Sequence, residues 1–308
     1  MTVTRIAIAG IGKIARDQHI PHIAANPAFE FVAGITRGGK SDVAVPCFRT
    51  IAEMLAAGTR VDAVAICTPP IGRAALIADA FAGGLDVLLE KPPAATLSEA
   101  ERFAAMARDA GRLLYMTWHS REAAAVEPAR AWLKDKTITR VEVDWLENVR
   151  QWHPGQDWIW EPGIGVFDPG INALSVITRI LPWPLTLTAS KLDFPANRPA
   201  PIAARLVLAS PDGVPVAAHF NWDQLGTQTW EIRVDTDHGK LVLTHGASRM
   251  AVDGQPVEVG DEAEYAALYR HFAQLIEARQ SDVDLAPFRL VADAYLLGQR
   301  HEVRPFAE

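Results

Sequence analysis

The strongest structural signal in the chain is the stretch Arg5-Ile6-Ala7-Ile8-Ala9-Gly10-Ile11-Gly12-Lys13-Ile14-Ala15, where a short apolar run leads into a glycine-rich turn. Residues 5–9 predict a buried strand, and residues 13–25 predict a helix. The turn has the form G-x-G-x-x-A, in which the first glycine permits a tight turn and the second lets a ligand approach the backbone. This context predicts that a dinucleotide pyrophosphate binds at the helix N-terminus. The residues expected to contact it are Gly10, Ile11, Gly12, Lys13 and Ile14.

The same alternation of strands and helices continues to about residue 117. Further strands are expected at 29–36, 61–68, 85–89 and 112–117, with helices at 51–57, 72–82 and 97–110. Nearly continuous apolar strands separated by helices are typical of a parallel sheet covered on both faces. The expected fold class is therefore α/β, with an N-terminal Rossmann domain built on a doubly wound parallel sheet.

A different pattern begins after about residue 118. Helices are expected at 123–132, 168–180, 263–278 and 285–298, and strands at 139–148, 185–194, 203–209, 214–222, 229–235 and 240–244. Strands in series indicate a C-terminal α+β domain on a largely antiparallel, open-faced sheet. We expect a dinucleotide-binding domain at 1–119 and a domain for substrate binding and oligomerisation at 120–308.

Composition restricts the classes of function. The chain has 308 residues, a formal net charge of −7 and two cysteines, Cys47 and Cys67. It contains no basic run, so nucleic acid is not expected as a partner. The cysteines have no metal-ligand spacing, and no apolar stretch of about 18 residues suggests a membrane span. No signal peptide is apparent, and a cytoplasmic protein without metal is expected.

The ends of the second and third strands bear on the choice of cofactor. The second strand ends in Thr36-Arg37, without the carboxylate that usually binds the ribose 2′-hydroxyl of NAD. Arg37 can pair with a 2′-phosphate and Thr36 can donate a hydrogen bond to it. We therefore expect NADP to be accepted, as the preferred or an equal cofactor beside NAD. Thr68 and Pro69, which end the third strand, are expected to line the cofactor cleft.

The fourth strand ends in Glu90-Lys91-Pro92. With this motif, the G-x-G-x-x-A turn and a later D-x-G, the chain resembles the glucose–fructose oxidoreductase/inositol dehydrogenase (Gfo/Idh/MocA) family over its whole length. The resemblance implies that Lys91 reaches both nicotinamide and substrate, and that the Lys–Pro bond is often cis. Glu90 and Trp118 are also expected at the cofactor site.

The D-x-G motif is Asp168-Pro169-Gly170-Ile171-Asn172, at the start of an expected helix. Most members of the family resemble D-x-G-x-H here, with the histidine as catalytic acid or base. An amide does not exchange a proton at neutral pH, so Asn172 is expected to orient a substrate hydroxyl instead. Proton transfer then falls to Asp168, to Lys91 or to the pair, and Asp168 also suits a helix N-cap.

Longer strings resemble one branch of the family, the bacterial L-arabinose and D-galactose 1-dehydrogenases. They are Trp118-His119-Ser120-Arg121, Glu147, Trp152-His153-Pro154-Gly155-Gln156, Trp158-Ile159-Trp160-Glu161 and residues 167–174. The resemblance implies oxidation of an aldopyranose at C1 to its lactone, and it does not fix the sugar. Substrate contacts are expected from Lys91, His119, Glu147, Trp152, His153, Asp168 and Asn172.

Two alternatives remain open. In place of an aldose 1-dehydrogenase, the first alternative is an oxidoreductase of the same family that acts on another polyol or sugar, and the second is a non-catalytic regulator that binds NADP. The presence of both Lys91 and Asp168 argues against the regulator. A homo-oligomer formed through the sheet of the second domain is also expected, as in the family.

Overall fold

The computed structural model describes residues 3–261 and 263–307, and these residues form two compact units. The first unit contains the described residues up to Trp118 together with Tyr265–Leu285, and the second contains the remainder. The expected boundary after residue 119 lies one residue beyond the point where the chain first passes from the first unit to the second, after Trp118. The return of Tyr265–Leu285 to the first unit differs from the expectation of one uninterrupted second domain.

The first unit is built on a six-stranded sheet with the order β3-β2-β1-β4-β5-β6, in which every neighbouring pair is parallel. The strands are β1 (Thr4–Ala9), β2 (Phe29–Ile35), β3 (Cys47–Phe48), β4 (Ala63–Ile66), β5 (Asp86–Leu89) and β6 (Leu114–Met116). This order is that of a doubly wound sheet, so the expected Rossmann fold is confirmed. Only the two-residue strand β3 had no expected counterpart.

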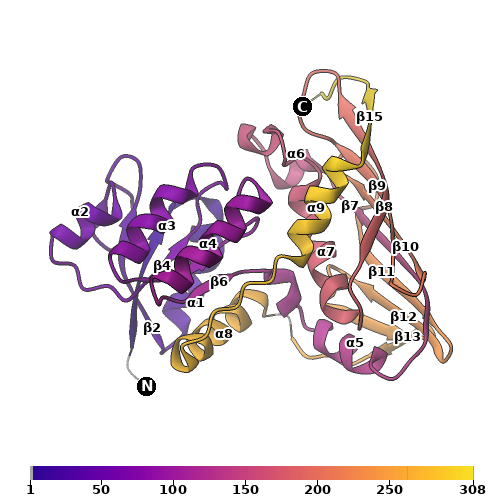
Figure 1. Cartoon of the computed structure of the whole chain (residues 1–308), viewed down its shortest axis with the longest axis horizontal. Helices are drawn as coiled ribbons and strands as arrows, with labels where there is room; N and C mark the ends of the chain where they lie inside the picture. Colours follow the sequence, from indigo (N-terminus) through magenta and orange to yellow (C-terminus); the bar gives the residue numbers. More distant parts are fainter. Residues whose placement is uncertain (1–2, 262, 308) are drawn as a thin grey trace. The chain divides into compact units, whose positions relative to one another are not determined.

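Helices cover this sheet, and one of them comes from far along the chain (Figure 1). They are α1 (Ile20–Ala25), α2 (Ile51–Ala56), α3 (Arg73–Ala82), α4 (Leu97–Asp109) and α8 (Glu264–Ala278), with a wider π-helical turn, η1 (Ala15–His19), before α1. Buried side chains of α8, among them Leu268 and Phe272, share one apolar cluster with Ile6 and Ile8 of β1. This burial explains why α8 belongs to the first unit.

The second unit is built on a nine-stranded sheet with the order β14-β13-β12-β11-β7-β10-β9-β8-β15. The strands are β7 (Ile138–Leu146), β8 (Thr186–Pro195), β9 (Ala203–Ala209), β10 (Pro215–Asn221), β11 (Thr229–Thr236), β12 (Gly239–Thr244), β13 (Arg249–Val252), β14 (Gln255–Val257) and β15 (Gly298–Val303). The pairs β10–β7 and β15–β8 are parallel and the others antiparallel, so the expected, largely antiparallel sheet is confirmed.

Helices α5 (Val126–Leu133), α7 (Phe167–Ile180) and α9 (Ala286–Leu296) lie along one face of this sheet (Figure 1). Short helical segments complete the unit: η2 (His119–Glu122), α6 (Val149–Trp152) and η3 (Asp157–Trp160). Gly170 of α7 faces β10, and a Cβ there would lie 2.7 Å from Cδ2 of Phe220. The glycine of the D-x-G motif therefore lets helix and sheet approach closely.

The last expected helix ends earlier than the sequence pattern indicated. It stops at Leu296, and Gly298 begins β15 instead of closing the helix. A Cβ at Gly298 would lie 2.7 Å from both Ala294 O and Leu192 Cδ1, so only glycine lets the chain turn onto β8 there.

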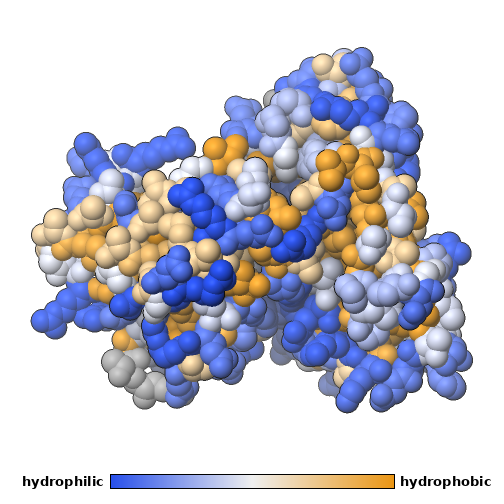
Figure 2. Space-filling view, viewed as in Figure 1, coloured by the Kyte–Doolittle hydropathy of each residue, from blue (hydrophilic) through white to orange (hydrophobic). Residues whose placement is uncertain are grey.

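Figure 2 shows hydrophilic and hydrophobic residues interspersed over the visible face of each unit. Among the described residues no helix has the length and apolar character needed to cross a membrane.

Candidate active site

The glycine-rich turn follows β1 at the carboxyl edge of the first sheet. Gly10 has a φ of 92°, and a Cβ there would lie 2.8 Å from Thr68 N, so both the conformation and the packing require glycine. A Cβ at Gly12 would meet no protein atom within 4 Å. The fold itself therefore does not require a glycine at position 12, and the open side of the turn suits the approach of a pyrophosphate.

Thr68 supplies a second feature of this edge. Its hydroxyl oxygen is buried and has no hydrogen-bond partner within the described part of the chain. Buried polar groups are almost always hydrogen-bonded, so an orphaned hydroxyl beside the turn fits a bound ligand that completes its bonding. The Thr68 hydroxyl and the open space beside Gly12 therefore fit a bound dinucleotide.

The loop after β2 contains the residues expected to select the cofactor. Thr36 donates its hydroxyl hydrogen to Lys40 O at 3.1 Å, and Arg37 is exposed. Arg16 of η1 reaches the same loop, where it contacts Ser41 Oγ at 3.0 Å and the Asp42 carboxylate. The hydrogen bond from Arg16 lowers the pKa of Asp42. Arg16 was not identified in the sequence, because the motif pattern gave no reason to place its side chain at this loop.

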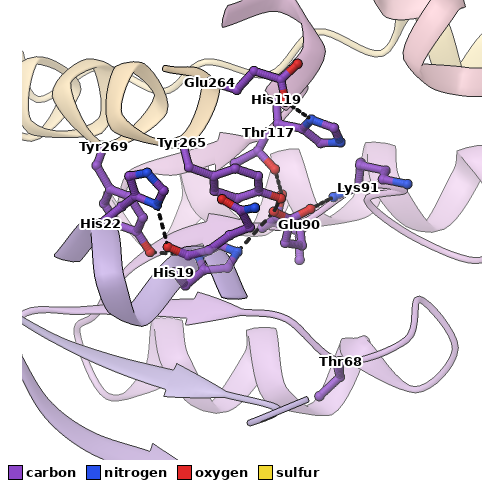
Figure 3. A network of polar contacts seen from close by, with 12 residues as sticks. His19, His22, Thr68, Glu90, Lys91, Thr117, His119, Glu264, Tyr265 and Tyr269 are labelled. Carbon is purple, nitrogen blue, oxygen red and sulfur yellow. Dashed lines mark hydrogen bonds and ion pairs between the residues drawn. The ribbon is translucent and has the colours of Figure 1, made fainter. Parts of the chain in front are cut away.

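Glu90, expected at the cofactor site, is buried behind Lys91 (Figure 3). Its Oε1 accepts hydrogen bonds from Tyr265 OH at 2.8 Å and contacts His19 Nε2 at 3.0 Å. Its Oε2 accepts the Lys91 backbone N–H at 2.8 Å. Both oxygens of the Glu90 carboxylate are therefore bonded to groups of the protein itself. Lys91 is half-buried, and the Lys91–Pro92 bond is cis, as the family resemblance implied.

His19 also belongs to this network. It is fully buried, and its Nδ1 lies 2.7 Å from Tyr269 OH. Burial alone would lower the pKa of His19, but interactions with Cys67 and the hydrogen bond to Glu90 raise it well above the ordinary value. Neither His19 nor the two tyrosines carried a motif signal for this role.

A buried arginine joins two strand ends at this edge. Arg73 donates from Nε to Thr68 O at 3.0 Å, and its Nη1 donates to the carbonyl oxygens of Glu90 and Pro92. Burial lowers the pKa of Arg73 to about 10. Arg73 thereby ties the segment after β4 to the turn that carries Lys91. The sequence offered no signal for it beyond a position at the start of α3.

In the second unit, Asp168 lies among expected substrate residues. It is buried, and its Oδ2 lies 3.4 Å from Nε2 of His153. Asp168 is the second residue of α7, and Val166 occupies the cap position without a side-chain hydrogen bond. The suggested N-cap role of Asp168 is therefore wrong. Asn172 lies one turn later in α7 and is half-buried.

Glu147 follows β7 and is held by two indoles. Its Oε1 accepts from Trp222 Nε1 at 2.8 Å, and its Oε2 accepts from Trp230 Nε1 at 2.9 Å. Burial raises the pKa of this carboxyl group, against the lowering effect of the indole hydrogen bonds. The Trp222 ring also lies edge-on to His153, with the ring centroids 5.2 Å apart. Glu147, His153 and Asp168 thus form one cluster within the unit.

The remaining residues expected at the site, Trp152, His119 and Trp118, each bond to a different partner. Trp152 is 45% exposed and donates from Nε1 to Gln228 Oε1 at 2.7 Å. His119 begins the second unit, and its Nδ1 lies 2.8 Å from Glu264 Oε2. Trp118 is buried in the first unit, and its Nε1 donates to Asp284 O at 2.9 Å. The indole N–H of Trp118 is therefore already bonded to protein. Within the described ranges there is no cluster of three or more potential metal ligands.

Comparisons with known proteins identify the family of the chain. Residues 4–118 match the family model GFO_IDH_MocA, described as an oxidoreductase family with an NAD-binding Rossmann fold. A galactose 1-dehydrogenase from Pseudomonas fluorescens is 46% identical over 310 residues, which cover 99% of each chain.

Solved structures extend the likeness to both units. A crystal structure of D-galactose-1-dehydrogenase from Rhizobium etli matches with a TM-score of 0.95 and 49% identity, over 100% of this chain and 99% of that one. A 3-ketoreductase from Actinomadura kijaniata, solved with NADP, matches with a TM-score of 0.80 over 98% of this chain and 100% of that one. At 19% identity, the second comparison shows the shared fold alone.

Proposed function

The chain belongs to the Gfo/Idh/MocA family of NAD-binding oxidoreductases, and from this membership we propose that it is an aldose 1-dehydrogenase. The proposed reaction oxidises a cyclic aldose at C1 to its lactone. The observation that carries the proposal is the likeness of both units, at 46% and 49% identity, to proteins named for galactose 1-dehydrogenation. D-Galactose is accordingly the first proposed substrate.

L-Arabinose is the second proposed substrate, because it differs from D-galactose in the pyranose form only by the hydroxymethyl group at C5. A pocket distinguishes such a pair by roughly 10–200-fold. Inositols and other polyols are less well supported, since Asn172 stands where most of the family resembles a histidine.

NAD(P), when bound, supplies the acceptor for the hydride that leaves C1. As C1 becomes a carbonyl carbon, the anomeric hydroxyl must lose its proton to a base. We assign that role to Asp168, a buried carboxylate, and assign Lys91 to binding the anomeric oxygen and lowering its proton affinity. The reverse assignment is the alternative. Either version requires that both side chains reach the same sugar.

The remaining proposed contacts come from the second unit. Each Glu147 oxygen accepts one indole N–H and keeps a further lone pair that can accept from a sugar hydroxyl. His153, Asn172 and His119 would supply further hydrogen bonds. The exposed ring of Trp152 offers a flat apolar face of the kind that packs on the C–H side of a sugar.

NADP is proposed as the preferred or equal cofactor. Thr36 and Arg37 follow β2 without a carboxylate, and Arg16 adds a second guanidinium to the same loop. The Asp42 carboxylate pairs with Arg16, so Arg37 is the cation better placed to meet a 2′-phosphate.

Homo-oligomerisation through the open face of the nine-stranded sheet is also proposed, together with a cytoplasmic location. Val207 of β9 is 50% exposed on that face, beside Arg205, which pairs with Asp193 of β8 at 3.4 Å. Val207→Arg should lower the molecular mass measured by analytical ultracentrifugation. An unchanged mass would reject this face as the interface. Both cysteines are free, which suits a reducing compartment.

The decisive experiment measures reduction of NAD and NADP with D-galactose, L-arabinose, D-fucose and myo-inositol, and identifies the product as a lactone. We expect turnover with the aldoses and little with inositol. Turnover only with inositol or another polyol would replace the proposed substrate class. Tight cofactor binding without turnover of any sugar would instead favour the regulator.

A further inference from the structure

Helix α8 brings two tyrosines to the strand end that carries Lys91. Tyr265 lies 175 residues from Glu90 in the sequence, yet its hydroxyl donates to Glu90 Oε1 at 2.8 Å. Tyr269, one helical turn further on, contacts His19 Nδ1 at 2.7 Å (Figure 3). Both tyrosines are buried, so these hydroxyls bond inside the first unit.

The wide turn η1 brings His19 to the same carboxylate. His19 ends η1, and its Nε2 lies 3.0 Å from Glu90 Oε1. Turns of this kind inside helices occur often at functional sites, because they shift side chains out of the regular helical register. Here the turn lies immediately after the glycine-rich turn, and it directs an imidazole at the carboxylate behind Lys91.

Glu90 links these groups to the lysine. Oε1 faces Tyr265 and His19, while Oε2 accepts the backbone N–H of Lys91 at 2.8 Å. A buried carboxylate is strongly destabilised unless it is hydrogen-bonded, so these contacts keep the Glu90 carboxylate in this position. Rotation of the carboxylate would release the Lys91 amide.

We propose that Tyr265 is a positioning residue for Lys91: its hydroxyl holds the Glu90 carboxylate against the Lys91 amide and so fixes the backbone from which the Lys91 ammonium extends. The inference rests on the proposed function in so far as Lys91 takes part in the reaction. It assigns part of the active-site geometry to α8, which follows eight of the nine strands of the second sheet in sequence.

Tyr269 provides a matched control. It is buried like Tyr265, lies on the same helix and also donates or accepts through one hydroxyl, but its partner is His19 and not Glu90. A purely structural role would make Tyr265→Phe and Tyr269→Phe similar in every measurement. A positioning role separates them in the measurements that report on Lys91.

The experiment compares Tyr265→Phe and Tyr269→Phe with the full-length parent chain. We expect Tyr265→Phe to lower kcat by about tenfold with the KM for galactose and the Kd for NADP changed less than about twofold, since a small displacement of a reacting group costs rate more than binding. Both variants should lower the Tm to a similar extent, but Tyr269→Phe should leave kcat within about twofold of the parent value. Equal kcat values in the two variants would overturn the proposal.

A second measurement does not depend on turnover. The rate at which a water-soluble acetylating reagent modifies Lys91, followed by peptide mass spectrometry, should change in Tyr265→Phe and stay at the parent value in Tyr269→Phe. If the parent chain turns over no sugar, the proposed function fails while this comparison still decides the positioning role. Should Tyr265→Phe not fold, Glu90→Gln, which keeps the side-chain shape, must show the same altered labelling; unaltered labelling would reject the proposal.

Discussion

The Oδ2 atom of Asp168 lies 3.4 Å from Nε2 of His153, although the two residues come from different segments of the second unit. The motif around Asp168 has asparagine at the position where the family resemblance implies a histidine, and here an imidazole approaches the aspartate from the loop after α6 instead. A histidine beside a buried carboxylate stabilises its charged form or exchanges a proton with it. The pair is therefore the natural place to test proton transfer.

Asp168→Asn should lower kcat by about 10²–10⁴-fold, because it removes a base while keeping the size of the side chain. The Kd for NADP, measured by isothermal titration calorimetry, should stay unchanged, since Asp168 belongs to the second unit. Asp157→Asn, at an exposed position of η3, serves as the matched control and should retain the parent kcat. Near-normal turnover in Asp168→Asn would transfer the role of base to Lys91.

Arg37→Ala should shift cofactor preference away from NADP. The guanidinium is exposed at the end of β2, and its pairing with a 2′-phosphate is a contact that NAD does not offer. We expect the ratio of kcat/KM for NADP over NAD to fall by about tenfold. Arg108→Ala on α4 controls for the loss of one positive charge. An unchanged ratio would show that Arg37 does not contact the 2′-phosphate.

Sequence patterns predicted the folds well where burial alternates regularly. The apolar strands of the first unit and the alternating strands β7 to β12 were expected within a few residues. The short strands β13, β14 and β15 were missed, since β14 is exposed throughout and β15 nearly so, which leaves no apolar periodicity. The helix α8 was expected, but an amphipathic pattern does not tell which sheet the apolar face covers.

The residues of the candidate site likewise differ in whether the sequence could predict them. Residues in local motifs, such as Gly10, Lys91 and Asp168, could be selected from the sequence because the motif itself carries the chemistry. Tyr265 and Arg73 could not, since their roles depend on contacts with residues that are distant in sequence or on backbone carbonyl groups. Glu147 was selected, yet its two indole partners lie 75 and 83 residues away.

Phe306→Ala should weaken the second unit near the cluster of Glu147, His153 and Asp168. The Phe306 ring lies 4.9 Å from the ring of Trp160, and the guanidinium carbon of Arg150 lies 4.3 Å from the Phe306 ring. Trp160 in turn contacts Trp222, which holds Glu147. Removing the half-buried ring should cost about 1–3 kcal/mol in the free energy of unfolding.

The same variant should raise the KM for galactose and leave the Kd for NADP unchanged, because its contacts lie in the second unit. Urea unfolding and steady-state kinetics measure the two effects. Leu296→Ala, which removes an apolar side chain that is 82% exposed, is the control for loss of apolar surface. A fall in stability with an unchanged KM would show that Phe306 does not influence substrate binding through Trp160 and Trp222.

Glu147→Gln tests the consequence of burying a carboxyl group between two indoles. Burial raises the pKa of Glu147 in the folded state, so between the ordinary glutamate pKa and the raised value the folded chain binds more protons than the unfolded chain. The free energy of unfolding contributed by this group therefore falls as the pH rises through that window. Glutamine does not titrate and removes this dependence.

The amide has a separate, pH-independent cost. Its NH2 group faces one of the two indole N–H donors that the carboxylate accepts, so one hydrogen bond is lost at every pH. The expected result is a variant whose stability, relative to the parent chain, increases as the pH rises above the ordinary glutamate pKa. Urea unfolding of both proteins across that window measures the difference. A constant difference would mean that Glu147 keeps an ordinary pKa in the folded chain, and its charge would then be compensated by more than the two indoles.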